Sequence, residues 1–264
     1  ENFKALTRQG NLIPIFKEID LDYDNPLSIL RKISSKKHCF LLESSAGPEK
    51  WSQYSFLGFD PTLIISSNQS EITIKSGKGE VKKLNKDIFL KLKEIMEKFN
   101  PVKVSGLPRF YGGLVGFFSY EIINQIENIS RKDHVRADFP DSLFMLTDSV
   151  IIFDNINKTA KIVINVHIKD KKTYKTSYKK ALDQINKIEA LLKSTKKNPY
   201  REIARFSKET HPIISNFTKP DILNAVKKIK KYVRAGDVIQ TVVSQRWETK
   251  YQDDPINLYR ALRK

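Results

Sequence analysis

The sequence predicts a mixed α/β protein of the α+β class, in which groups of antiparallel strands alternate with helices. Residues at alternate positions over Lys161–Ile168 form two sets, one of which (Ile162, Ile164, Val166 and Ile168) is entirely apolar, a pattern typical of a strand. Apolar residues recur at helical spacing over Asp87–Phe99, which indicates an amphipathic helix. Hydrophobic residues make up 40% of the 264 residues, which is enough to build a substantial core.

The first hundred residues predict a strand, a helix, a hairpin and a meander, in that order. A short strand and turn are expected over Leu12–Asp24, followed by a helix over Pro26–Ser34 with the proline at its first position. The stretch Phe40–Pro61 is expected to form two paired strands around a Gly-Pro turn. Alternation over Thr62–Leu84, broken by a glycine turn, indicates a meander, and Asp87 is a plausible N-cap for the helix that follows.

The middle of the chain is apolar and glycine-rich. A strand is expected over Phe110–Tyr120, passing into a helix-like stretch, and two further strands are expected around a turn at Asp154–Thr159. The spacing of Gly112, Gly113 and Gly116 fits neither a P-loop nor a dinucleotide fingerprint. We therefore expect these glycines to allow close packing of a neighbouring element.

The last hundred residues predict a surface helix, a polar linker and a helix–strand–helix segment. The surface helix lies within the lysine-rich stretch Lys169–Lys197. An amphipathic helix follows and ends at Gly236, which is a typical C-terminal cap residue. A strand is expected over Asp237–Trp247, and another helix begins at Asp254–Pro255.

The formal net charge is +17, which allows either a nucleic-acid or anionic-membrane binder or a lysine-rich solvated surface. We favour the second, because the lysines are spread along the chain and no nucleic-acid recognition motif accompanies them. No apolar stretch approaches the roughly 20 residues of a membrane span. The single cysteine, Cys39, cannot form an internal disulfide, and we expect the protein in the cytoplasm.

Polar groups stand directly after the apolar run Cys39–Leu42. Glu43, Ser44 and Ser45 could form a ligand clamp, in which the carboxylate holds an ammonium group and the hydroxyls hold a carboxylate. The alternative is a capped turn with solvated side chains. The histidines are scattered and lack zinc-ligand spacing, so the residues by themselves indicate a small-molecule site of unidentified chemistry.

Four stretches carry a resemblance to a known family when they are taken in order. They are FLLESSAGPEKWSQYSFLGFDP, YGGLVGFFSYEIINQIEN, DFPDSLFMLTDSVIIFDN and AVKKIKKYVRAGDVIQTVVSQRW. Together they resemble component I of anthranilate synthase, a family of chorismate-utilising enzymes. The resemblance spans Leu12–Lys264 and implies two intertwined lobes built on β-sheets with flanking helices. It divides the chain into an N-terminal region (1–168), a helix and polar linker (169–218) and the start of a chorismate-binding domain (219–264).

The resemblance implies an enzyme that converts chorismate and ammonia to anthranilate and pyruvate in tryptophan biosynthesis. A glutamine amidotransferase subunit (component II) would supply the ammonia, and Mg²⁺ would bind the substrate carboxylate. In relatives the catalytic and Mg²⁺-binding residues follow the position that corresponds to Lys264, so we assign no catalytic or metal residue here. We expect the chain to be an N-terminal portion that is inactive by itself, with no specific nucleic-acid or membrane partner.

The resemblance also implies a feedback site for tryptophan beside the Leu-Leu-Glu-Ser strand end. Glu43 would accept the ligand's ammonium group, and Ser44 would contribute a hydroxyl. Relatives usually carry a basic residue where this chain has Gln53, and a neutral amide gives a carboxylate no charge-assisted contact. We therefore expect weak tryptophan binding. Two alternatives stay open, namely component I of aminodeoxychorismate synthase and a non-catalytic tryptophan-sensing or docking module.

Overall fold

The computed structural model describes residues 2–21, 24–33, 36, 38–44, 53–77, 79–128, 139–194 and 211–263. The chain divides into two compact units, unit 1 (Glu1–Asn198) and unit 2 (Pro199–Lys264). The boundary between them falls inside the segment 169–218 that the sequence marks as helix and linker. Sheets and helices are mixed along the chain, which confirms the predicted fold class.

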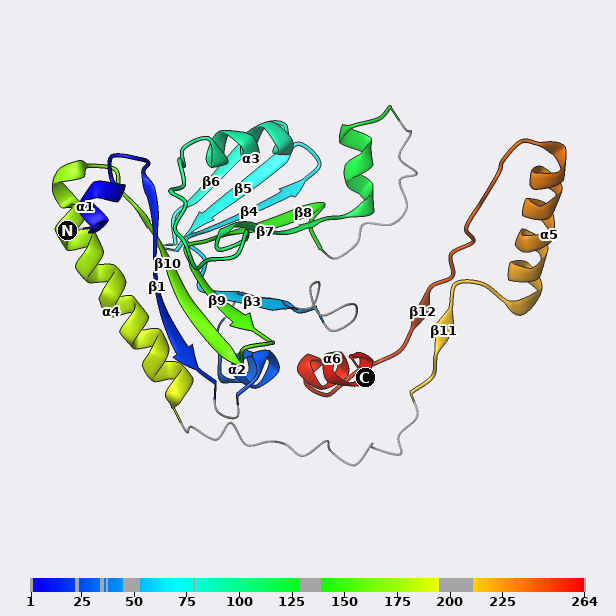
Figure 1. Ribbon diagram of the computed structural model, residues 1–264. Coiled ribbons are helices and arrows are strands. Elements are labelled where there is room, and N and C mark those ends of the chain that lie inside the picture. Colours follow the sequence, from blue (N-terminus) through cyan, green and yellow to red (C-terminus); the bar gives the residue numbers. More distant parts are fainter. Residues whose placement is uncertain are drawn as a thin grey trace. The chain divides into compact units, whose positions relative to one another are not determined.

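Unit 1 contains two five-stranded antiparallel sheets. In the first, sheet A, the strand order is β1-β10-β9-β3-β2 (Figure 1). Its strands are β1 (Leu12–Asp20), β2 (Cys39–Leu42), β3 (Tyr54–Phe59), β9 (Ser149–Asp154) and β10 (Thr159–His167). The predicted pairing of the two strands is confirmed, because β2 pairs with β3 in a register that sets Leu42 opposite Phe56. The predicted Gly-Pro turn lies outside the described residues.

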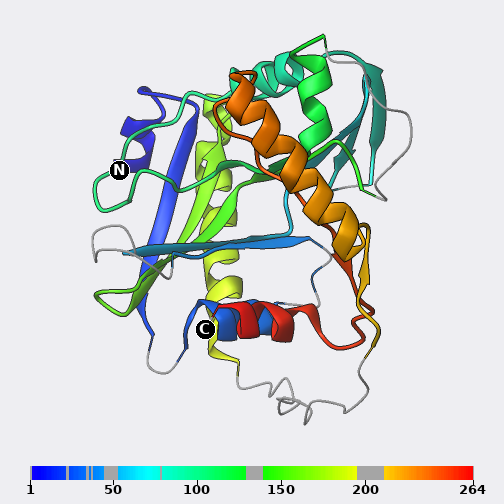
Figure 2. The same cartoon turned by 90° about the vertical axis from the view of Figure 1, so that its right-hand side faces the viewer.

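Helices cover one face of sheet A. They are α1 (Asn2–Leu6), α2 (Pro26–Lys32) and α4 (Tyr174–Lys193), the last preceded by the short 3₁₀ helix η2 (Lys171–Thr173). Helix α4 lies along β1 and β10 in both views (Figures 1 and 2). Its buried residues Ile185 and Ile188 join Ile13 and Ile162 of the sheet in one apolar cluster. The helix predicted within Lys169–Lys197 is therefore present, and its apolar face forms part of the core of unit 1.

The second sheet of unit 1, sheet B, has the strand order β6-β5-β4-β8-β7. Its strands are β4 (Leu63–Asn68), β5 (Glu71–Ser76), β6 (Val81–Asn85), β7 (Gly113–Phe118) and β8 (Ser142–Thr147). Helix α3 (Ile88–Met96) packs its buried Ile88 and Ile95 against the sheet. The Asp87 side chain accepts a hydrogen bond from the Leu90 amide, which confirms the predicted N-cap.

The glycine-rich stretch is confirmed as a strand, β7, which ends in a 3₁₀ helix, η1 (Tyr120–Gln125). A Cβ atom at Gly116 would lie 1.9 Å from the Leu143 carbonyl oxygen of β8. One at Gly112 would lie 2.3 Å from the side-chain nitrogen of Asn165. At these two positions glycine allows the close packing that the sequence analysis favoured over phosphate binding.

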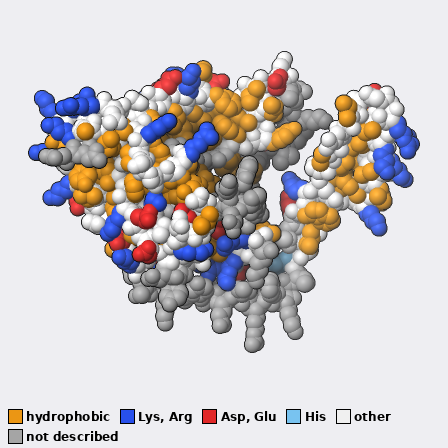
Figure 3. All heavy atoms as spheres, in the orientation of Figure 1, with side chains coloured by type: hydrophobic (Ala, Val, Ile, Leu, Met, Phe, Trp, Pro, Cys, Tyr) orange, Lys and Arg blue, Asp and Glu red, His pale blue; other side chains and the backbone are white. Residues whose placement is uncertain are grey.

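Unit 2 consists of two helices and a minimal two-stranded sheet. Its elements are β11 (Ile214–Ser215), α5 (Lys219–Ala235), β12 (Trp247–Glu248) and α6 (Pro255–Leu262). Thr218 and Asp221 form a capping box at the start of α5, and Gly236 ends it with a positive φ of 81°. None of residues 211–263 is buried. Figure 3 shows apolar side chains along α5 with lysine and arginine side chains at its outer edge.

The prediction of a strand over Asp237–Trp247 is wrong. The chain is irregular from 237 to 246, and only Trp247–Glu248 form a strand, paired with Ile214–Ser215. A strand needs a neighbour to pair its backbone groups, and alternation in sequence supplies none. Ile239 and Val242, both within the predicted strand, are 99% and 80% exposed. Within the described part of the chain, no helix has the length and apolar character of a membrane span.

Candidate ligand site at the β2–β3 connection

The three predicted site residues lie at one end of sheet A. Glu43 and Ser44 follow the last residue of β2, and Gln53 precedes the first residue of β3. Since Leu42 pairs with Phe56, continuing this register by two residues sets Ser44 opposite Tyr54. Glu43 and Ser44 are half-buried. Ser45 lies outside the described residues, as does the rest of the stretch 45–52.

Gln53 is tied into the fold by its side chain and its backbone. Its side-chain nitrogen Nε2 donates to the Tyr54 hydroxyl at 3.0 Å and to Asp154 Oδ2 at 3.4 Å. Its carbonyl oxygen accepts a hydrogen bond from the Asn155 amide at 2.8 Å. The Gln53 side chain, which stands where relatives are expected to carry a basic residue, is therefore already hydrogen-bonded to the Asp154 carboxylate.

Asp154, which the sequence analysis placed in a turn only, is a further polar residue of this site. Its side chain is buried, and its Oδ1 accepts hydrogen bonds from the amides of Ile156 and Asn157 at 3.1 and 3.0 Å. Burial raises the pKa of Asp154, but hydrogen bonds from Asn157 and Gln53, among others, outweigh burial and lower it. Asp154 thus adds a fixed negative charge beside Gln53.

An aromatic surface adjoins these polar residues on sheet A. The Phe56 ring lies 6.4 Å from the Tyr54 ring and meets the Phe110 ring edge-on at 5.1 Å. Leu42 lies on the same face as Phe56, because residues directly opposite in an antiparallel pair share a face. Val150, Ile152 and Val163 are buried beneath these rings. The strand end therefore combines the Ser44 hydroxyl and an apolar wall on one face with the Glu43 carboxylate on the other, because the same register sets Glu43 opposite Ser55.

This combination suits an amphipathic ligand that carries an ammonium group. A carboxylate such as that of Glu43 binds ammonium through charge-assisted hydrogen bonds, and aromatic side chains bury flat apolar groups. It is less suited to a ligand carboxylate, because Gln53 is neutral and bonded to the anionic Asp154.

The described residues contain no group of three or more His, Cys, Asp or Glu side chains that could hold a metal ion. The Mg²⁺ that the sequence resemblance implies therefore has no ligand set in this part of the chain. We assign no chemical step to a metal here.

Comparisons with known proteins identify the family to which this chain belongs. Residues 37–264 match the family of chorismate binding enzymes, and the chain belongs to that family. The crystal structure of anthranilate synthase component I from Streptococcus pneumoniae TIGR4 is similar in fold, with a TM-score of 0.60 at 22% identity. That similarity covers 93% of this chain and 52% of the other.

Curated relatives point to one branch of this family. Anthranilate synthase component 1 of Acetivibrio thermocellus is 32% identical over 266 residues, and that of Aquifex aeolicus (strain VF5) is 35% identical over 271 residues. Both alignments cover 100% of this chain and 53% of the relative. The chain therefore spans about half the length of the curated relatives it matches.

Proposed function

We propose that this chain is the N-terminal half of component I of an anthranilate synthase. The observation that carries the proposal is the family match over residues 37–264, together with relatives that share one name and align along the whole chain. The complete protein is proposed to convert chorismate and ammonia to anthranilate and pyruvate. It would act as a cytoplasmic lyase with Mg²⁺ and a glutamine amidotransferase subunit that delivers ammonia.

The chain by itself is proposed to be inactive. Its second unit presents large apolar side chains to solvent, including Ile239 at 99%, Val242 at 80% and Leu262 at 79% exposure. Apolar surface of this extent is normally covered by further structure. Because a chorismate site must exclude water to control proton transfers, an open unit 2 is poorly suited to catalysis.

Anthranilate fluorescence tests this function directly. The 264-residue chain and a version extended to the length of its relatives are each mixed with chorismate, Mg²⁺ and ammonium. We expect anthranilate and pyruvate from the extended protein only. If chromatography instead identifies aminodeoxychorismate as the product, the protein is component I of aminodeoxychorismate synthase. Turnover by the 264-residue chain would overturn the proposed inactivity.

The β2–β3 connection is proposed to be the tryptophan feedback site. Glu43 would accept the ammonium group, and Ser44 would donate its hydroxyl to the ligand carboxylate at the end of β2. Gln53 cannot offer a charge-assisted contact to the carboxylate, and Asp154 lies beside it. Tryptophan affinity is therefore proposed to be weak.

Calorimetry with tryptophan tests the feedback site on the 264-residue chain. Glu43→Gln is expected to weaken binding at least tenfold, because a charge-assisted hydrogen bond contributes about 1.5–3 kcal/mol. Glu71→Gln is the matched control, since it removes an exposed carboxylate of sheet B that pairs with Lys83. Equal affinity of the two variants would exclude Glu43. Tight binding in a protein whose extended form makes no product would favour a non-catalytic sensor.

A further inference from the structure

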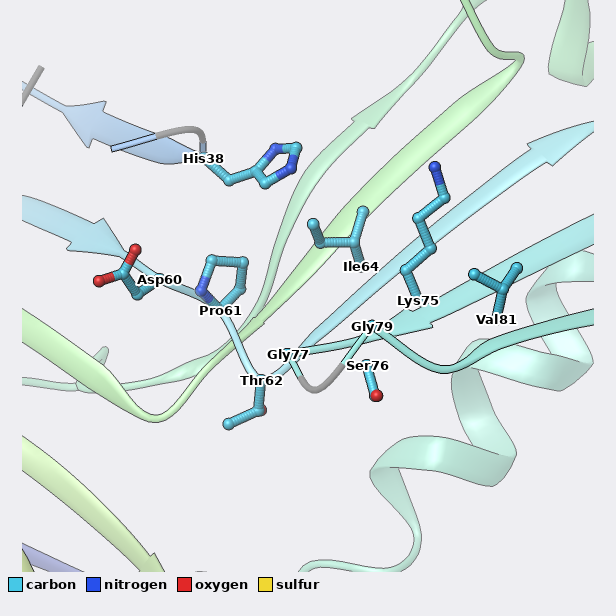
Figure 4. A pocket seen from close by; sticks show the side chains of 10 residues that line it. All are labelled: His38, Asp60, Pro61, Thr62, Ile64, Lys75, Ser76, Gly77, Gly79 and Val81. Carbon is cyan, nitrogen blue, oxygen red and sulfur yellow. The ribbon is translucent and has the colours of Figure 1, made fainter. Parts of the chain in front are cut away.

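A hollow of about 470 Å³ lies in unit 1, away from the β2–β3 connection. Figure 4 shows the residues that line it. They are His38, Asp60, Pro61, Thr62, Ile64, Lys75, Ser76, Gly77, Gly79 and Val81. His38 precedes β2 and Glu43 follows it, and a strand rises about 3.3 Å per residue. The five residue-to-residue steps from His38 to Glu43 therefore separate the hollow from the candidate effector site by roughly 16 Å.

Two basic side chains face the opening of this hollow. The His38 imidazole and the Lys75 ammonium lie on either side of Ile64 in Figure 4. Within the part of the chain that the structure describes, neither side chain takes part in an ion pair. Both therefore keep hydrogen-bond donors that a ligand can use.

The acidic residue of the lining does not cancel this charge. Asp60 Oδ2 lies 2.6 Å from the Lys36 ammonium, so its charge is already compensated. In Figure 4 its carboxylate turns away from Lys75. The hollow thus has a positive charge at Lys75 and a further hydrogen-bond donor at His38, and a protein of net charge +17 adds a long-range attraction for anions.

The floor and rim of the hollow are apolar or already hydrogen-bonded. Ile64, Pro61 and Val81 supply apolar surface. The amide of Gly77 donates to the Thr62 carbonyl oxygen and that of Gly79 to the Ser76 carbonyl oxygen, both at 2.9 Å. These two backbone amides are therefore already hydrogen-bonded within the fold, and a ligand would be bound by side chains. A Cβ atom at Gly79 would meet nothing within 4 Å, so the rim is open to solvent.

We propose that this hollow is a second small-molecule site, which binds an organic carboxylate with an apolar body. Lys75 and His38 donate to the carboxylate oxygens, and Ile64 and Val81 contact the apolar body. Its volume lies within the range of ordinary ligand pockets. The proposal does not depend on the proposed enzymatic activity, because it uses only the residues that line this hollow of unit 1.

Ligand-observed ¹⁹F NMR with 4-fluorobenzoate tests the site on the 264-residue chain. Saturable binding is expected at or below about 10 mM, and 4-fluorobenzyl alcohol, which lacks the charge, is expected to bind far more weakly. Lys75→Gln and His38→Gln should each weaken 4-fluorobenzoate binding roughly fivefold, as the loss of one partly exposed charge contact implies. Added salt should weaken binding to the unmodified chain.

Lys82→Gln is the matched control, because Lys82 is an exposed neighbour of Val81 that does not line the hollow. Val81→Trp is a second test that keeps every charge and fills the opening, and it is expected to abolish binding. Thermal unfolding of each variant confirms that the fold is kept. The proposal fails if 4-fluorobenzoate does not bind, or if Lys75→Gln and Lys82→Gln weaken binding equally, since diffuse charge would then account for it.

Discussion

In unit 1 both α3 and α4 bury one face, whereas in unit 2 neither α5 nor α6 has a buried residue. Helices α3 and α5 begin in the same way, with Asp87 capping α3 and Thr218 capping α5. Local signals therefore set where a helix begins whether or not a core supports it. The difference lies in tertiary burial, which supplies most helical stability in proteins.

The largest expected difference between the units comes from removing one apolar side chain. Phe153 of β9 is 1% exposed and belongs to the core of sheet A. Phe153→Ala should lower the free energy of unfolding by about 3–5 kcal/mol, because it removes buried surface and leaves a cavity. Ile239→Ala, at a residue 99% exposed in unit 2, should change it by less than about 0.5 kcal/mol. Urea titration measures both, and similar losses would contradict the comparison.

The next effect concerns pH and the junction of the two sheets. Asp148 is the single residue between β8 of sheet B and β9 of sheet A. Burial raises its pKa from 3.8 to about 6, against a hydrogen bond from Thr62 that lowers it. The folded state therefore holds a proton between these pH values that the unfolded state has lost, and stability falls as pH rises from about 4 to about 6.

Asp148→Asn removes this titration. The cost in the unmodified protein is at most about 3 kcal/mol, fully present above pH 6. The variant should be the more stable protein at pH 7, and its profile should be flatter between pH 4 and 6. Denaturant unfolding at several pH values measures this, and a stability that rises over that interval in the unmodified protein but not in Asp148→Asn would reverse the sign we assign.

A smaller effect is expected at the candidate effector site. Asp154→Ala leaves the amides of Ile156 and Asn157 without their acceptor, which should cost about 1–3 kcal/mol. Gln53→Ala loses side-chain hydrogen bonds of 3.0 Å to the Tyr54 hydroxyl and 3.4 Å to the same carboxylate, but leaves no buried backbone amide unpaired, and should cost less than about 1 kcal/mol. Chemical denaturation ranks the two. A larger loss for Gln53→Ala would show that Gln53, rather than Asp154, organises this end of sheet A.

The smallest effect separates local from global stability. Asp87→Ala and Thr218→Ala each remove an N-cap and should weaken their own helix by about 1 kcal/mol. Only the first should lower the midpoint of the cooperative unfolding of unit 1, because α3 is part of its core. Circular dichroism should show reduced helix content before unfolding for Thr218→Ala. An equal shift of the main transition in both variants would mean that the units unfold together.

Sequence reasoning succeeded where structure is determined over a few neighbouring residues. Asp87, Pro26 and Gly236 mark helix ends through caps that act within one turn, and each was predicted. The β2–β3 and β9–β10 pairs were also predicted, because a turn between two strand-like runs favours antiparallel pairing.

Sequence reasoning failed where a partner lies far along the chain. The strand expected over Asp237–Trp247 has the right residue types, but it has no neighbouring strand over most of its length. The contact of Gln53 with Asp154 joins residues 101 positions apart, and no local pattern connects them. The sequence did contain a partial signal for the role of Asp154, since an aspartate at the start of a turn commonly accepts hydrogen bonds from the backbone amides that follow it.

Hydrogen exchange of the whole chain tests the central claim that unit 1 is supported by its own core while unit 2 is held mainly by local signals. Amides of β9 and β10 are expected to exchange only through global unfolding. Amides within α5 should exchange at least about 100-fold faster. Equal protection of α5 and β10 would contradict the claim, because α5 would then share the cooperative stability of unit 1.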